Sequence, residues 1–179
     1  MKIGMIRHFK VTRGYPNKYV NTNELLQWMK EYDESAVEEI DLDMKQIEWK
    51  RCYSSDLPRA RATAEKAFSG SISYRKELRE ISLAPFLRLN LRLPLFIHLL
   101  FIRIVWLCGH RSQPETKQQV IDRIHTVLDE ALQVNEDVLI VGHGGLMIFM
   151  RKELLRRGFA GPSFQRASNG KLYVYDKNH

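Results

Sequence analysis

The sequence predicts an α/β fold, a three-layer sandwich in which helices flank a mainly parallel central sheet. Short apolar runs alternate along the chain with segments whose apolar residues recur at helical spacing, and this alternation is typical of such sheets. The length suits a single domain, residues 1–179, with a hydrophobic core of its own. Apolar residues make up 44% of the chain, which excludes a disordered protein.

The first half of the chain divides where its apolar pattern changes. Short apolar runs predict three strands, at residues 2–7, 51–54 and 72–77. Helical spacing predicts two helices, one over about 24–33 capped by Asn23 and one from a Ser55 or Asp56 cap to about Phe68. Residues 8–22, which contain Gly14 and Pro16, predict a loop.

The second half continues the alternation. Apolar residues at helical spacing after Pro114 predict a long helix that ends near Gln133. The run at 138–141 predicts a central parallel strand. A helix to about Arg157, stopped by Gly158, and a last strand at 171–175 follow.

The formal net charge of +7 favours an anionic partner: a phosphorylated substrate, a nucleic acid or an anionic membrane surface. The basic residues are scattered and form no dense block, so we expect a small phosphorylated substrate and no nucleic acid. Cys52 and Cys108 are too few for a disulfide framework. We therefore expect a cytoplasmic protein with two buried thiols, and residues 1–8 lack the long apolar run of a secretory signal.

Three short groups of residues carry candidate chemistry, and each follows a predicted strand. They are Arg7-His8, Ser55-Asp56-Leu57-Pro58-Arg59-Ala60 with Thr63-Ala64, and Gly142-His143-Gly144-Gly145. Because ligands of parallel sheets bind beyond the carboxyl ends of the strands, we expect the groups to meet at one edge. Two histidines and two arginines there would form a site for a phosphoryl group.

These residue types fit phosphoryl transfer. A neutral imidazole is a competent nucleophile near neutral pH, and the guanidinium fork of arginine matches the geometry of phosphate oxygens. The sequence contains neither a phosphate-binding Gly-x-x-x-x-Gly-Lys loop nor the spacing of a metal site. No metal and no cofactor is therefore expected.

The three groups together resemble the signature motifs of the histidine phosphatase superfamily, the phosphoglycerate mutase-like family. Ile6-Arg7-His8 is similar to its first motif, the Ser55 to Ala64 group to its second, and Val141 to Gly145 to its third. The motifs occur in the family's order and span nearly the whole chain. The resemblance implies a phosphoglycerate mutase-like fold and a phosphoryl group carried transiently on a histidine.

Carried over by position, the resemblance implies a role for each matching residue. His8 would be the nucleophile, and Arg7, Arg59 and His143 would bind the phosphoryl oxygens, with His143 also part of the catalytic set. Glu80, in the sequence Leu78-Arg79-Glu80, would be the proton donor, with Glu77 as the alternative. The chain departs from the family pattern at Phe9, Val11 and Gly14, which leaves the substrate open.

The apolar stretch from Phe86 to Cys108 is long enough to span a bilayer but contains three arginines, each costly there. A span would also separate Glu80 from His143, so a transmembrane helix is rejected. Three interpretations remain: core, a lid over the site, or contact with a membrane or partner. We prefer a lid-like insertion at about 83–112 in which Arg88 or Arg92 meets a second anionic group. Peripheral membrane contact is the less favoured alternative.

The leading hypothesis is a phosphomonoesterase that hydrolyses its substrate through a phosphohistidine on His8. One alternative is a phosphoglycerate mutase-type phosphotransferase. Another is a non-catalytic relative that binds a phosphorylated ligand or a membrane surface. The natural substrate and the oligomeric state are left open.

Overall fold

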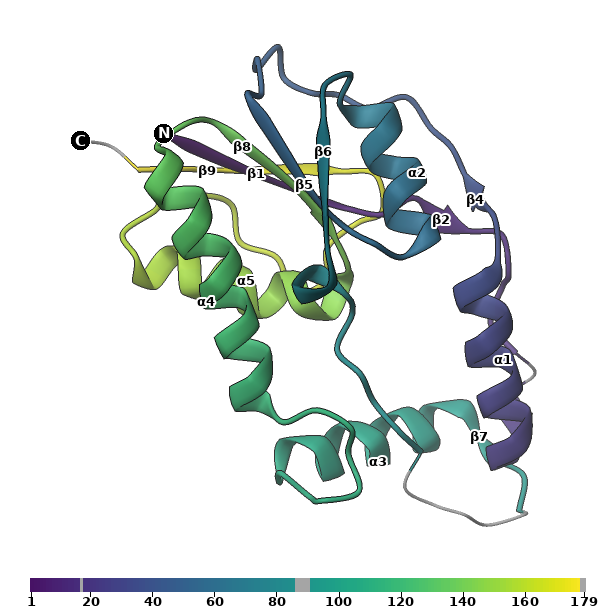
Figure 1. The fold of residues 1–179 in the computed structure, drawn as a ribbon. Helices are drawn as coiled ribbons and strands as arrows, with labels where there is room; N and C mark the ends of the chain where they lie inside the picture. The colour runs from purple at the N-terminus through teal and green to yellow at the C-terminus, as the bar shows by residue number, and fades with distance from the viewer. Residues whose placement is uncertain (17, 86–90, 178–179) are drawn as a thin grey trace.

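The computed structural model describes residues 1–16, 18–85 and 91–177. A five-stranded sheet lies at its centre, in the order β6-β5-β8-β1-β9 (Figure 1). Its strands are β1 (Lys2–Arg7), β5 (Arg51–Ser55), β6 (Ile72–Arg75), β8 (Val138–Gly142) and β9 (Leu172–Asp176). The first four are parallel and β9 is antiparallel to β1. The predicted α/β fold with a mainly parallel sheet is confirmed.

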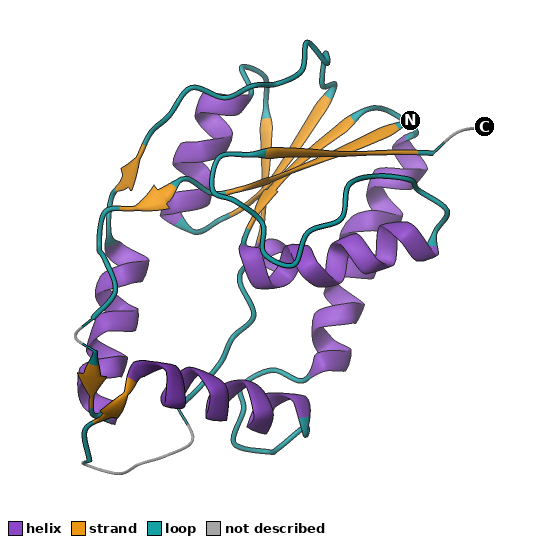
Figure 2. Ribbon diagram, turned by 180° about the vertical axis from the view of Figure 1, so that it is seen from behind, coloured by secondary structure: helices purple, strands orange, loops and turns teal. Residues whose placement is uncertain are grey.

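Helices cover both faces of this sheet (Figures 1 and 2). The helix α2 (Pro58–Ala67) covers one face, and α4 (Lys117–Val134) and α5 (Gly144–Arg156) cover the other. Alternate strand residues point to opposite faces, so Ile3 and Met5 join the core under α4 and α5, whereas Ile6 joins the core under α2. Both faces are therefore buried, as in a three-layer sandwich.

Two helices begin at cap residues other than those predicted. The helix α1 (Thr22–Glu34) is capped by Asn21, not Asn23, because Asn21 and Glu24 form a reciprocal capping box. Neither Ser55 nor Asp56 caps α2. Its cap is Leu57, which makes no side-chain cap bond, and Pro58 occupies the first turn. The long helix α4 begins after Thr116, which forms a capping box with Gln119.

Several short elements differ from the prediction. The segment predicted as a loop at 8–22 contains the two-residue strands β2 (Lys10–Val11) and β3 (Tyr19–Val20). These pair with the unpredicted strands β4 (Val37–Glu38) and β7 (Leu93–Pro94). The strand expected at 72–77 ends at Arg75 and is followed by the 3-10 turn η1 (Lys76–Leu78). Pairs this short carry no apolar pattern in the sequence and depend on their distant partner strands.

The second part of the apolar stretch forms the helix α3 (Leu95–Leu107), which begins immediately after Pro94. Residues 86–90, and with them Arg88, lie outside the described residues. Within the part of the chain that is described, no helix is both long and apolar enough to cross a membrane. The prediction for the cysteines holds only for Cys52, since Cys108, at the end of α3, is exposed.

Candidate active site

The three sequence groups meet at one edge of the sheet. Arg7 ends β1 and lies opposite Gly142, the end of β8, and the His8 backbone nitrogen donates to the Gly142 carbonyl at 2.9 Å. Because β5, β8 and β1 are adjacent and parallel, the loops that follow them lie side by side. The first turn of α2 brings Arg59 to this edge, and His143 is the N-cap of α5. The structure thus brings the predicted nucleophile to the same edge as the three residues predicted for phosphate binding.

The two histidines face each other in a buried position. Their ring centroids are 5.1 Å apart, and His8 and His143 are 3% and 0% exposed. The Nδ1 atom of His8 lies 2.6 Å from the carbonyl oxygen of Phe9. A carbonyl oxygen only accepts hydrogen bonds, so Nδ1 carries the proton and the Nε2 lone pair is free. This is the tautomer that a nucleophile requires.

The surroundings keep both imidazoles neutral. Burial, together with the Arg59 and Arg7 guanidinium groups, lowers the pKa of His8 to about 3. The hydrogen bond to the Phe9 carbonyl acts in the opposite direction and raises this pKa. Burial also holds the pKa of His143 well below its usual value, and the charges of His8, Arg59 and Arg7 lower it further. Desolvation and neighbouring positive charge both disfavour the protonated ring.

The two arginines are held from different directions. Arg7 donates from Nη1 to the carbonyl of Ala167 at 2.9 Å. A side chain at Gly144 would lie 3.1 Å from Arg7 Nε, so glycine there lets the guanidinium approach the start of α5. Arg59, only 4% exposed, donates from Nη1 to Asp33 Oδ1 at 2.7 Å.

Several buried nitrogens at this edge have no hydrogen-bond partner among the described residues. They are Nε of Arg7, Nε of Arg59 and Nδ1 of His143. A buried donor without a partner costs free energy, and most such groups in folded proteins are satisfied. An anion with several acceptor oxygens, such as a phosphoryl group, could accept from the arginine nitrogens together.

Glu80 contacts the same edge, whereas the Glu77 side chain makes no hydrogen bond to it among the described residues. The Glu80 carboxylate accepts from the backbone nitrogens of Gly145 and Leu146, each at 3.0 Å. It therefore sits at the start of α5, two residues from His143, where backbone N–H groups have no partner within the helix. A side chain at Gly145 would lie 2.6 Å from the carboxylate oxygen. Its role as proton donor stays a prediction.

Three further polar residues support the site and were not predicted as site residues. Ser55 Oγ lies 2.9 Å from Nε2 of His143, and Thr63 Oγ1 accepts from the Phe9 backbone nitrogen at 2.8 Å. Asn169 donates from Nδ2 to the His8 carbonyl at 2.7 Å. Ser55 and Thr63 belong to the second motif, so their position there was a usable signal. Nothing near Asn169 in the sequence indicates its contact with His8.

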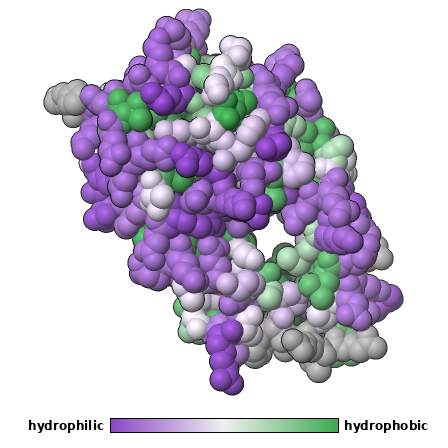
Figure 3. Space-filling view, viewed as in Figure 1, coloured by the Kyte–Doolittle hydropathy of each residue, from purple (hydrophilic) through white to green (hydrophobic). Residues whose placement is uncertain are grey.

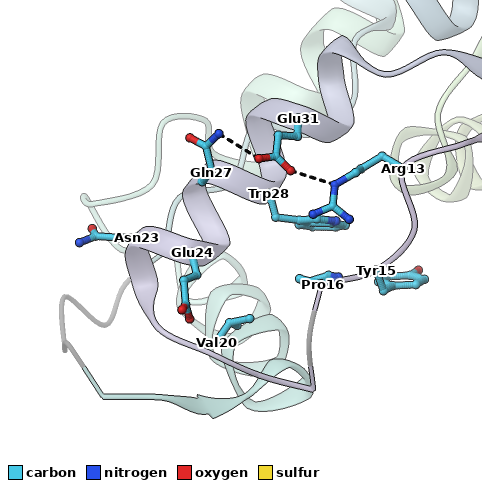
Figure 4. A pocket seen from close by; sticks show the side chains of 9 residues that line it. All are labelled: Arg13, Tyr15, Pro16, Val20, Asn23, Glu24, Gln27, Trp28 and Glu31. Carbon is cyan, nitrogen blue, oxygen red and sulfur yellow. Dashed lines mark hydrogen bonds and ion pairs between the residues drawn. The ribbon is translucent and has the colours of Figure 1, made fainter.

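An aromatic wall leads outward from the site. Tyr32 lies beside Arg59, with the guanidinium 5.4 Å from its ring, and Trp28 and Tyr15 continue the row at 5.4 and 5.9 Å between ring centroids. This wall and Arg7 line a cavity of about 160 Å³. A larger depression of about 470 Å³ lies farther along α1, where Trp28 packs beside Arg13, which pairs with Glu31 (Figure 4).

The chain belongs to the histidine phosphatase superfamily (branch 1), whose family model matches residues 34–178. The match includes Arg59, Glu80 and His143. Arg7 and His8 precede it, so their assignment depends on the geometry described above. No curated protein matches the sequence at a significant level.

Solved structures share the fold at low sequence identity. The α-ribazole phosphatase of Shigella flexneri is 16% identical with a TM-score of 0.58, over 99% of this chain and 91% of that one. A mycobacterial glucosyl-3-phosphoglycerate phosphatase in complex with VO3 is 17% identical with a TM-score of 0.61, over 97% and 90%. Both similarities extend over nearly the whole length of each chain and establish a common fold.

Proposed function

We propose that this protein is a phosphomonoesterase that hydrolyses a small phosphorylated substrate through a phosphohistidine on His8. One observation carries the proposal: a buried pair of neutral histidines, 5.1 Å apart, lies among two arginines with unpartnered buried nitrogens. That combination offers a nucleophile and an anion-binding cradle at one point. Family membership and the phosphatase names of both structural neighbours support the same reaction class.

In the first step, Nε2 of His8 attacks phosphorus in line with the leaving oxygen. The P–O bond to the leaving group breaks, and Glu80 supplies the proton that this oxygen takes up. Arg7, Arg59 and His143 stabilise the charge that spreads over the phosphoryl oxygens. In the second step, water attacks the phosphohistidine, Glu80 accepts a proton from that water, and inorganic phosphate leaves while His8 returns to its neutral form.

The part of the substrate beyond the phosphate would extend along the aromatic wall. Tyr32 and Trp28 offer a flat apolar surface that continues directly from Arg59, and such surfaces bind rings and other apolar groups. The names of the two neighbours include a ribazole and a glucosyl phosphoglycerate, which are ring-containing substrates. A phosphomonoester with a ring close to its phosphate is therefore the proposed substrate class.

We also propose that residues 1–179 form one domain, with an insertion at about 83–112. The structure gives less support to a lid within this insertion than the sequence does. Trp106 is 5% exposed and belongs to the main core, so it is a structural residue. Neither cavity described above is lined by a residue of α3.

The function is tested with purified protein and p-nitrophenyl phosphate, with released phosphate as the readout. His8→Ala is expected to lower kcat at least about a thousandfold, because the nucleophile is lost, while circular dichroism stays that of the parent. Mass spectrometry of quenched reactions should place an acid-labile phosphoryl group on His8.

Other outcomes would point elsewhere. Isomerisation of 3-phosphoglycerate without net phosphate release would indicate the mutase-type phosphotransferase. Binding of vanadate with no turnover of any phosphomonoester would indicate a non-catalytic relative. Wild-type activity in a folded His8→Ala variant would contradict the proposed mechanism while leaving a phosphatase possible.

A further inference from the structure

Helix α3 is apolar on every side but is packed on only one. Its sequence, Leu95–Leu107, contains two polar residues, His98 and Arg103. One stripe faces inward: Ile102 packs with Val20 and Leu25, Trp106 reaches the main core, and His98 bonds to the Val20 carbonyl at 2.9 Å. A helix that is hydrophobic all round is normally enclosed all round.

The rest of the helix surface is exposed and apolar, and we call it the outer face of α3. Its members are Phe96 (65% exposed), Leu99 (37%), Leu100 (52%), Phe101 (42%), Ile104 (46%) and Leu107 (62%). Figures 1 and 2 place α3 at the end of the molecule away from both termini. In the space-filling view, hydrophobic side chains gather at this end, below a body covered mostly by hydrophilic residues (Figure 3). Contiguous exposed apolar surface of this kind marks an interaction site.

The charges around the outer face have one sign. The 34 residues from 81 to 114 contain no Asp or Glu. Arg103 lies on α3 itself and Arg111 follows it, and both are exposed without an ion pair to any described residue. Arg92, just before the helix, is exposed as well and pairs with Glu24. An exposed apolar surface with one arginine within it and others at the ends of the helix complements an apolar layer beneath a negatively charged surface.

We propose that the outer face of α3 docks on the surface of a bilayer that contains anionic phospholipids. The helix has 13 residues and is therefore about 20 Å long, too short to cross a hydrocarbon core of about 30 Å. It would lie in the plane of the interface with Phe96, Leu100 and Leu107 among the acyl chains. Arg103 and Arg111 would contact lipid phosphates.

A second copy of the chain fits this surface less well. A two-fold interface places the same patch against itself, so the outer face would bring the Arg103 side chains of the two copies close together, and residues 81–114 contain no Asp or Glu to pair with them. The outer face is also not positioned to cover the candidate active site. The inward stripe of α3, on the opposite side of the helix, is the side that packs on α1 and on the core.

The test is co-sedimentation of the full chain with vesicles of phosphatidylglycerol and phosphatidylcholine in equal parts, and with vesicles of phosphatidylcholine alone. Stronger binding to the anionic vesicles is expected, and salt at about 0.5 M should weaken it by screening the arginines. Phe96→Gln with Leu107→Gln should weaken binding by about tenfold or more, since each side chain loses its burial in lipid. Arg103→Glu with Arg111→Glu should weaken it by about tenfold.

The matched control is Leu26→Gln with Leu155→Gln, which removes two exposed leucines outside α3 and should leave vesicle binding unchanged. No binding to anionic vesicles, equal binding to both vesicle types, or equal loss in the control would overturn the proposal. A dimer in sedimentation velocity that the Phe96/Leu107 pair dissociates would show a self-interface instead. A raised KM in the Phe96→Gln, Leu107→Gln double variant, with unchanged vesicle binding, would support the lid hypothesis instead. None of these readouts depends on whether the protein is a phosphatase.

Discussion

The candidate site and helix α3 invert the usual distribution of side chains in opposite ways. The site buries two histidines and an arginine, whereas α3 exposes six large apolar residues. Buried polar groups need partners, and the protein supplies many of them: the Phe9 carbonyl for His8, Ser55 for His143 and Asp33 for Arg59. The outer face of α3 has no corresponding partners within the described residues.

The comparison shows what each inversion implies about function. In the site, a few buried nitrogens at one edge of the sheet remain without a hydrogen-bond partner among the described residues, which indicates a ligand that accepts hydrogen bonds. On α3, the exposed face makes no directional contact, so it defines only the polarity of what covers it. Substitutions in the site should therefore change the catalytic rate. Substitutions on the inner side of α3 should change the stability of the fold, and those on its outer face should change association with a partner surface.

The two sides of α3 should differ most in stability. Trp106→Ala removes a core side chain that packs on Phe149 and donates to the Glu115 carbonyl, and should lower the free energy of unfolding by about 3–5 kcal/mol. Phe96→Ala should change it by less than about 0.5 kcal/mol, since Phe96 is largely exposed. Urea denaturation measures both. Similar losses for the two variants would contradict the assignment of an inner and an outer side.

Within the site, the buried arginine should matter far more than its exposed neighbour on the same helix. Arg59→Ala should lower kcat by about 10²–10³-fold, or about 2.7–4 kcal/mol of barrier, as for the loss of one preorganised donor. Arg61→Ala, which removes an exposed side chain stacked on Tyr74, should change kcat by less than about threefold. Steady-state kinetics on p-nitrophenyl phosphate would decide. An equally small effect at Arg59 would make it a structural residue.

Glu80 contacts the start of α5 and is also the proposed proton donor. Substrates with different leaving groups can distinguish a structural role from a chemical one. Glu80→Gln should slow hydrolysis of an alkyl phosphate by about a hundredfold, because its leaving oxygen needs a proton. The first step on p-nitrophenyl phosphate, measured as the burst of p-nitrophenol, should slow by less than about threefold, because this leaving group needs no proton. Glu77→Gln is the control and should affect neither substrate. Equal losses on both substrates, with a lowered melting temperature, would indicate that Glu80 only holds α5 in place.

The buried histidines should make the protein less stable in mild acid. His8 has a pKa of about 3 when folded, from burial first and then the arginine charges, against about 6.5 when unfolded. The unfolded chain therefore binds more protons, and stability falls as the pH drops below 6.5 toward 3. At pH 5 this histidine should cost about 2 kcal/mol relative to pH 7.

Urea midpoints of the parent and of His8→Asn at both pH values measure this effect. The variant should lose about 2 kcal/mol less than the parent on acidification, although His143, whose pKa is also lowered by burial, still titrates. An identical loss in the two proteins would mean that His8 is protonated normally in the folded state.

Local signals account for much of what could be predicted. The apolar runs at 2–7 and 138–141 become β1 and β8, because strands buried on both faces must be apolar throughout. The glycines after His143 belong to the third motif, and the structure shows Arg7 and Glu80 in the space that side chains there would fill. The cap at Asn21 was missed because Asn23 is a residue of the same type nearby, and the cap at Leu57 was missed because this residue makes no side-chain cap bond.

The sequence by itself determined the order along the chain of the central-sheet strands and of α1, α2, α4 and α5, and the three motifs at the strand ends. Apolar periodicity is a property of short segments, which is why these could be predicted. Only the tertiary structure decided that Glu80 rather than Glu77 reaches α5, that Asn169 binds the His8 carbonyl, and that α3 is packed on one side alone. Each of these depends on contacts between residues far apart in the chain. The sequence of a helix that is apolar on all sides does not indicate which side the rest of the protein will cover.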